Sequence, residues 1–190
     1  CASCHEAQVQ DWTNSHHDLA MQEANDKTVL GDFDNATFIY EGVTTTFSRR
    51  GDEYWVKTDN ESGELQDYRV AYVFGVYPLQ QLLLPVQNDR LNALSIAWDA
   101  RNASEGGQRW YHIYEDQEPV TSESPLHWTG VYHNWNSRCA ECHSTNVVKG
   151  YDGERRQYTT TYDQIDVGCE ACHGPGSGHV ELATCLLYTS

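Results

Sequence analysis

The sequence predicts an α+β fold, in which short helices and loops at both ends surround an antiparallel β-rich middle segment. Three observations favour this class. Apolar residues near the start recur at helical spacing, residues 37–116 are rich in β-branched and aromatic residues, and cysteine and histidine motifs lie in both ends but not in the middle. We expect the two ends to meet in space, with the β-rich segment as an insert between them.

The first element expected is an amphipathic helix over residues 6 to about 24. Its apolar face is formed by residues three or four positions apart, namely Val9, Trp12, His16, Leu19 and Ala20. On such a helix, His16 lies near the middle of the apolar face and His17 lies about 100° round from it. Periodicity alone therefore favours His16 as the buried residue of the two.

The middle segment, residues 37–116, is expected to form antiparallel strands. Its runs TFIY, VTTTFS, YWVKT, YRVAYVF and LSIAW combine β-branched and aromatic residues, with turns at RRGD and DNESGE. We expect residues 1–184 to be one domain that contains this insert. The last six residues, CLLYTS at 185–190, match the translation of a sequencing-library adapter, so we predict that they are an artefact and assign Cys185 no function.

Charge and hydropathy restrict the classes of partner. The chain has 12 basic and 28 acidic side chains, for a formal net charge of -16. This charge argues against nucleic-acid binding and favours a redox partner protein with a basic docking surface. No apolar run of about 18 residues occurs, so we expect no membrane segment in this fragment. Because Cys1 already lies inside a motif, we expect the natural N-terminus to be missing.

Three motifs carry the chemistry: CASCH at residues 1–5, CAECH at 139–143 and CEACH at 169–173. In a C-x-x-C-H motif the two thiols bond to the vinyl groups of haem c, and the histidine ligates the iron. The composition gives about 0.01 matches by chance, so the short helices at both ends are predicted to bind three covalently attached haems c. The predicted binding residues are Cys1, Cys4, His5, Cys139, Cys142, His143, Cys169, Cys172 and His173.

A structural zinc site is the main alternative for these cysteines. The last two motifs offer four cysteines, which could form zinc knuckles, and a C-x-x-C pair could also be a redox disulfide. Both alternatives leave the histidine after each pair unexplained. We therefore favour haem.

The distal iron ligands must come from the six histidines outside the motifs, which are His16, His17, His112, His127, His133 and His179. Six residues separate His179 from His173, and the chain would have to pass round the porphyrin edge to reach the same iron, so His179 is expected to reach a neighbouring haem. His112 and His127 are candidate ligands, although packed histidines are as good an interpretation, and His133 ranks below them. Met21, the only methionine, is interpreted as a packing residue.

The combination of CASCH, W-x-x-S-H-H-D-L-A-M, HWTG, CAECHST and CEACHGPGSGH resembles the cytochrome c-554 and c-prime-like group of multihaem cytochromes, in particular members that continue into tetratricopeptide repeats. The resemblance implies electron transfer in the periplasm or at the cell surface. It also implies that His17, and not His16, is a distal ligand, and that His179 is another. The sequence departs from the pattern at His133, and it ends where repeats would begin.

Three functions are compatible with the sequence. We predict electron transfer through three bis-histidine haems, with no catalytic residue. The alternative is a multihaem oxidoreductase that acts on small nitrogen or sulfur compounds at a five-coordinate haem, with a pocket furnished by Arg109, Tyr111, His112 and His127. A sensor or scaffold is the third. Covalent haem attachment takes place outside the cytoplasm, so we expect a periplasmic or cell-surface location.

Overall fold

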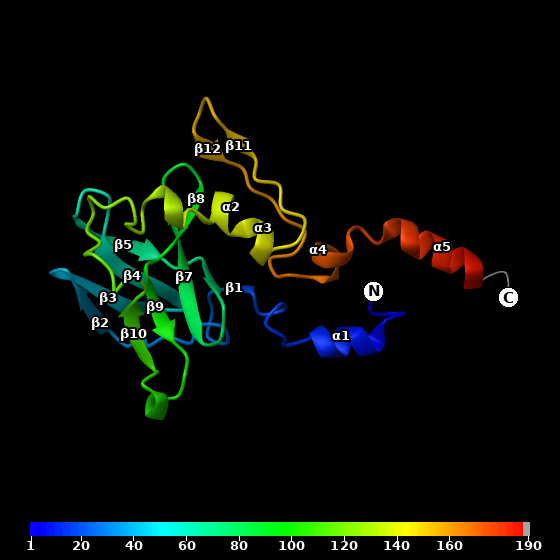
Figure 1. Cartoon of the computed structure of the whole chain (residues 1–190), viewed down its shortest axis with the longest axis horizontal. Helices are drawn as coiled ribbons and strands as arrows, with labels where there is room; N and C mark the ends of the chain where they lie inside the picture. Colours follow the sequence, from blue (N-terminus) through cyan, green and yellow to red (C-terminus); the bar gives the residue numbers. More distant parts are fainter. Residues whose placement is uncertain (188–190) are drawn as a thin grey trace.

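The computed structural model describes residues 1–187, with side chains described through residue 183. Figure 1 shows two twisted sheets at one end of the molecule and the short helices of both chain ends at the other. The sheets are antiparallel throughout, and the helices are short, so the predicted α+β class with a β-rich middle is confirmed. The adapter-like tail predicted from Cys185 onward has its side chains outside the described residues.

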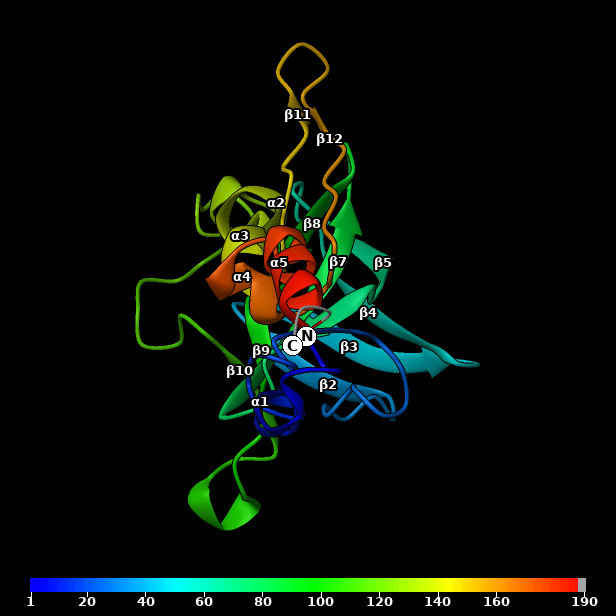
Figure 2. The same cartoon turned by 90° about the vertical axis from the view of Figure 1, so that its right-hand side faces the viewer.

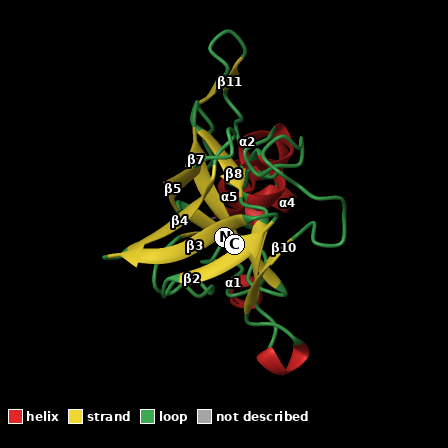
Figure 3. Ribbon diagram, turned by 90° about the vertical axis from the view of Figure 1, so that its left-hand side faces the viewer, coloured by secondary structure: helices red, strands yellow, loops and turns green. Residues whose placement is uncertain are grey.

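A four-stranded antiparallel meander forms the first sheet, whose strands are drawn as yellow arrows in Figure 3. Its strands, in order, are β2 (Ala36–Tyr40), β3 (Val43–Arg50), β4 (Glu53–Asp59) and β5 (Leu65–Arg69). The turn between β2 and β3 contains Glu41 and Gly42, both with positive φ, as a tight hairpin turn requires. The predicted turn at RRGD likewise joins β3 to β4.

The second sheet joins the insert to the N-terminal segment. Its strand order is β1-β6-β7-β9-β10, with β8 paired to β7. The bounds are β1 (Met21–Glu23), β6 (Tyr72–Phe74), β7 (Leu79–Val86), β8 (Arg90–Ala93), β9 (Ile96–Asp99) and β10 (Arg109–His112). Because β1 comes from before the insert and pairs with β6 inside it, this sheet fixes the insert to the chain start.

Two apolar clusters hold the sheets together. The larger one lies between the sheets and is rich in aromatic rings, among them Phe33, Phe47 and Trp110, with Phe47 and Trp110 stacked 3.7 Å apart. The smaller one lies under the second cysteine motif and contains Met21, Trp135 and Ala140. The smaller cluster therefore connects the β-rich body to the helical end.

The helix expected over residues 6 to 24 is much shorter, and that prediction is wrong beyond Trp12. Helix α1 spans Glu6–Trp12 and buries none of its residues. Asn14 has φ of 61°, and its N–H donates to the Asp18 carboxylate, which ends the helix. Residues 21–23 then pair with β6 as strand β1, so contacts in the sheet override helical periodicity there.

The remaining elements are short and come after β9 in the chain. They are η1 (Ala103–Glu105), η2 (Val131–His133), α2 (Trp135–Arg138), α3 (Ala140–His143), the hairpin strands β11 (Tyr151–Asp152) and β12 (Gln157–Tyr158), α4 (Cys169–His173) and α5 (Ser177–Leu187). The β11–β12 hairpin projects from the body between the second and third motifs (Figure 1). Within the described residues, no helix is long and apolar enough to cross a membrane.

Candidate haem-binding site

All three cysteine motifs lie at the helical end of the molecule. The first motif precedes α1, the second forms α3 and the third forms α4, so each cysteine pair falls on a single helical turn. Figure 2 views this end directly and shows both chain termini there, with α5 above α1. The six described cysteines are all free thiols, four of them exposed and two half-buried, as attachment to an external group requires.

The chain ends are joined by direct contacts, as the sequence predicted. The indole Nε1–H of Trp12 donates to the carbonyl oxygen of Val167 at 2.9 Å, and the Val167 N–H donates to the carbonyl oxygen of His17 at 3.1 Å. Since Val167 lies two residues before Cys169, these bonds place residues 12–17 beside the third motif. The exposed imidazole of His17 is therefore close to that motif in the fold.

His5 and His179 come together although they are at opposite ends of the chain. Their ring centres are 6.1 Å apart, with 29° between the ring planes. Two imidazoles bound to one metal ion from opposite sides, with bonds of about 2 Å, have ring centres about 6 Å apart. The distance between the His5 and His179 ring centres is therefore one at which both rings could hold the same metal ion.

The buried sulfur of Met21 makes contacts beside the second motif. Met21 is 1% exposed, and its Sδ accepts a hydrogen bond from Trp135 Nε1 at 3.0 Å and a weaker one from Ser144 Oγ at 3.6 Å. Ser144 directly follows His143, so this contact lies under the motif. Because the sulfur is enclosed by these donors, the structure supports the interpretation of Met21 as a packing residue.

A threonine connects the second motif to the third. Thr145 is 1% exposed, and its hydroxyl donates to the Asp166 carbonyl oxygen and accepts from the Gly168 N–H, both at 2.8 Å. Its backbone N–H also donates to the Gln164 carbonyl oxygen at 3.0 Å. Gly168 is the residue before Cys169, so Thr145 fixes the spacing between the end of one motif and the start of the next.

The donor set fits a haem and does not fit zinc. Within residues 1–183, no group of three or more His, Cys, Asp and Glu side chains is arranged to hold a metal ion, so the four-cysteine zinc site has no support. At the second motif, Nδ1 of His143 is buried without a hydrogen-bond partner, and the ring as a whole is partly exposed. This ring therefore offers its other nitrogen, Nε2, as a ligand, which is the nitrogen that a C-x-x-C-H motif uses.

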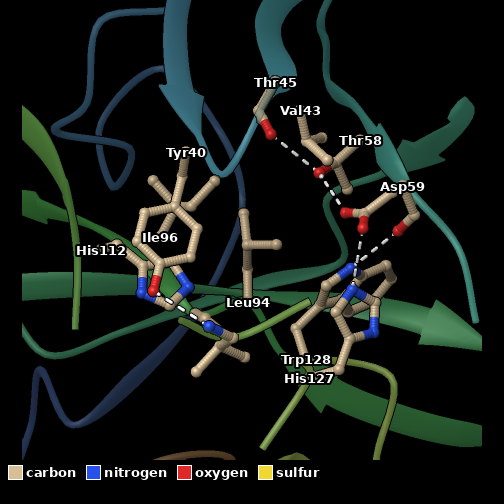
Figure 4. A pocket seen from close by; sticks show the side chains of 12 residues that line it. Tyr40, Val43, Thr45, Thr58, Asp59, Leu94, Ile96, His112, His127 and Trp128 are labelled. Atoms are coloured by element: carbon tan, nitrogen blue, oxygen red, sulfur yellow. Dashed lines mark hydrogen bonds and ion pairs between the residues drawn. The ribbon is translucent and has the colours of Figure 1, made fainter. Parts of the chain in front are cut away.

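His112 and His127 lie elsewhere, on a small cavity inside the β-rich body (Figure 4). The cavity has a volume of about 30 Å³, enough for about one water molecule. Tyr40 stacks on His112 with ring centres 3.7 Å apart. Burial and the neighbouring His133 and His127 lower the pKa of His112 to about 4, so this ring is neutral at pH 7.

His127 has both ring nitrogens in hydrogen bonds. Its Nε2 lies 3.1 Å from the buried Asp59 carboxylate, and its Nδ1 lies 2.8 Å from the Thr129 hydroxyl. The neighbouring indole of Trp128 donates to the Asp59 carbonyl oxygen at 2.8 Å. Asp59 is thus the residue that sequence reasoning missed in this region, because only the folded sheet brings it to His127.

The pocket predicted for the oxidoreductase alternative is not assembled. Side chains alternate along β10, so Trp110 and His112 are buried while Arg109 and Tyr111 point to the other face. Arg109 instead pairs with Glu115 at 3.6 Å. His133, which ranked low as a ligand, is buried beside the Tyr114 hydroxyl.

Cysteine pairs on single turns of the chain, each followed directly by a histidine, are the arrangement that defines a c-type cytochrome. The chain belongs to the cytochrome c554 and c-prime family, whose model matches residues 1–37 and 98–174, more than half of the chain. The family implies covalently bound haem c. No curated protein and no solved structure gives a significant match.

Proposed function

We propose that this protein is an extracytoplasmic multihaem cytochrome that transfers electrons through three covalently attached haems c. The spacing of His5 and His179 is the observation that carries the proposal, because it pairs a motif histidine with a histidine from another motif segment. Haem supplies a one-electron carrier when bound. Family members are generally extracytoplasmic, which agrees with the location that covalent attachment requires.

The attachment residues follow from the motifs. Each haem would be held by the two thiols of one motif, with the following histidine as the proximal ligand. The residues are Cys1, Cys4 and His5; Cys139, Cys142 and His143; and Cys169, Cys172 and His173. The protein orients these groups through short helices that are fixed to each other by Thr145 and by the junction between Trp12 and Val167.

Distal ligands are proposed to come from other segments, so that the haem segments interlock. His179, from the segment of the third motif, would complete the haem of the first motif. His17 would serve a haem beside the third motif, a role supported by the hydrogen bond from the Val167 N–H to the His17 carbonyl oxygen. The third distal position is open to His112 or His127, but either ring would first have to leave its contacts with Tyr40 or Asp59.

The domain boundaries belong to the same proposal. The family match is interrupted over residues 38–97, which contain most of the two sheets. We propose one cytochrome domain over residues 1–184 with the β-rich segment as an insert. The net charge of -16 supports a partner with a basic docking surface.

The test combines haem counting with one ligand variant. Protein matured with the c-type haem assembly machinery should contain three haems per chain in a pyridine haemochrome assay, all low-spin when oxidised. In His179→Ala, one haem of the three should become high-spin, whereas His16→Ala should leave every haem low-spin. A single high-spin haem in the parent protein would favour the oxidoreductase, and absence of covalent haem would refute both functions.

A further inference from the structure

The β-rich insert supplies one side chain to the second haem motif. Phe74 packs edge-on against the His143 ring, with ring centres 5.4 Å apart and 82° between the planes. Phe74 is the last residue of β6, where it pairs with Met21 of β1 in the second sheet. It lies within residues 38–97, which the family model does not match. The contact is therefore a feature of this chain that the family pattern does not include.

The His143 ring also differs from the other two motif histidines. Its Nδ1 is buried and has no hydrogen-bond partner, whereas His5 and His173 are exposed, where water can bond to the second ring nitrogen. The surroundings differ in the same way. Ala140 inside the second motif is fully buried and Cys139 is half-buried, while every residue of the first motif is exposed. The second motif is thus the most enclosed of the three.

Both differences act on a haem potential in the same direction. A ligating imidazole that donates its Nδ1–H to an acceptor becomes a stronger donor and stabilises the ferric iron, so loss of this bond raises the potential. Apolar burial disfavours the more highly charged ferric form, which raises the potential further. Phe74 contributes to both effects, because an aromatic edge excludes water from His143 and accepts no hydrogen bond.

Resting on the proposed function, we propose that Phe74 tunes the haem of the second motif to the highest potential of the three. Phe74 is a positioning residue in this role, since it acts through His143 and contacts no substrate. The β-rich insert then decides which haem holds the electron when the chain is partly reduced. Each of the other two haems would pass its electron towards the second motif.

The experiment is a spectroelectrochemical titration of the holoprotein with three variants at two positions. Phe74→Gln places an amide oxygen beside His143 and should lower the equilibrium constant for reduction of the highest-potential haem about tenfold, or about 59 mV for one electron. Phe74→Leu offers no hydrogen-bond acceptor and should lower this equilibrium constant less. Ile39→Gln introduces the same amide at an exposed position on β2 and should leave the potentials of all three haems unchanged.

A fourth variant identifies the haem without relying on Phe74. Replacement of both thiols, Cys139→Ala with Cys142→Ala, prevents attachment at the second motif and should remove the highest-potential component while two lower ones persist. Survival of that component would overturn the proposal, as would a parent-like titration of Phe74→Gln with three haems bound. A haem count of zero in the parent protein would instead refute the proposed function itself, so the two failures are distinguishable.

Discussion

The Asp59 carboxylate is held in the interior of the β-rich body by few partners. Its Oδ2 pairs with His127 Nε2, and its Oδ1 accepts from the Thr58 hydroxyl at 3.3 Å. In Asp59→Ala, the buried His127 nitrogen loses its partner, so we expect the free energy of unfolding to fall by about 2 kcal/mol. Chemical denaturation of the holoprotein measures this.

Asp67→Ala is the matched control for that variant. Asp67 pairs with Arg50 at 2.7 Å, but both side chains are at least 40% exposed. A solvent-exposed ion pair contributes less than about 1 kcal/mol. Equal losses of stability in the two variants would contradict a special role for the buried pair.

His112 makes stability depend on pH. Its pKa is lowered from 6.5 to about 4 by burial, and burial lowers the pKa of His133 as well. Between these pH values the unfolded chain binds more protons than the folded chain, so stability rises with pH from about 4 to 6.5 and is fully present above 6.5. In His112→Gln, the free energy of unfolding measured by chemical denaturation should rise less across this pH window than it does in the parent protein.

The same variant tests the ligand interpretation of His112. A histidine bound to iron does not titrate in this way, and its removal changes the spin state of one haem. We expect His112→Gln to keep the parent visible spectrum and to lose part of the pH dependence. A new high-spin signal would identify His112 as the missing distal ligand and contradict the pH prediction.

Thr145 links the end of the second motif to the start of the third at the helical end. Its hydroxyl bonds both to the Asp166 carbonyl oxygen and to the Gly168 N–H. Thr145→Val keeps the shape but leaves these two backbone groups unpaired, so we expect a loss of about 2 kcal/mol. Thr145→Ser retains the hydroxyl, so its free energy of unfolding should fall less.

Two further measurements test how the Thr145 variants affect the segments that carry the second and third motifs. The loss of both bonds frees the segment before Cys169, so limited proteolysis should cut residues 163–168 faster in Thr145→Val than in Thr145→Ser. Spin coupling between haems, followed by electron paramagnetic resonance, should also weaken. Parent-like proteolysis of Thr145→Val would show that the packing of Met21 and Trp135 is sufficient to hold the two motifs.

Local sequence pattern predicted the strands of the first sheet better than it predicted the other helices and strands. The runs at β2, β3 and β4 carry threonine and aromatic residues between clear turn signals, so propensity and fold agree there. None of the named runs within residues 37–116 covers β7, whose apolar residues are mainly leucine and not β-branched or aromatic. The helix past Trp12 was predicted wrongly, since pairing of Met21 with Phe74 is a long-range contact that periodicity cannot contain.

The candidate site also contains some residues that the sequence predicted and others that only the fold shows. The motif residues are contiguous, so their chemistry could be predicted from spacing alone. Phe74, Asp59 and Thr145 carry no local signal, because each acts through a neighbour that only the folded chain supplies. The proximity of His5 and His179 is intermediate: the short distance along the chain disfavoured a shared haem for His173 and His179, but only the fold brings His179 to His5.

The whole molecule carries a large negative charge. Seven of its 12 basic side chains already pair with carboxylates of the same chain, namely Arg49, Arg50, Arg69, Arg101, Arg109, Lys149 and Arg155. The net charge of -16 would act at long range on the basic redox partner that we propose. It should accelerate encounter with a basic partner and slow encounter with an acidic one.

This field predicts the salt dependence of electron transfer. The screening length shrinks from about 30 Å at 0.01 M salt to about 8 Å at 0.15 M. In stopped-flow mixing, the second-order rate with a small basic redox protein should fall by about tenfold or more over this range. The rate with an acidic redox protein of similar size and potential should rise or stay constant, because screening then removes repulsion. If both rates fall together, charge does not guide the encounter, and a local apolar contact must select the partner instead.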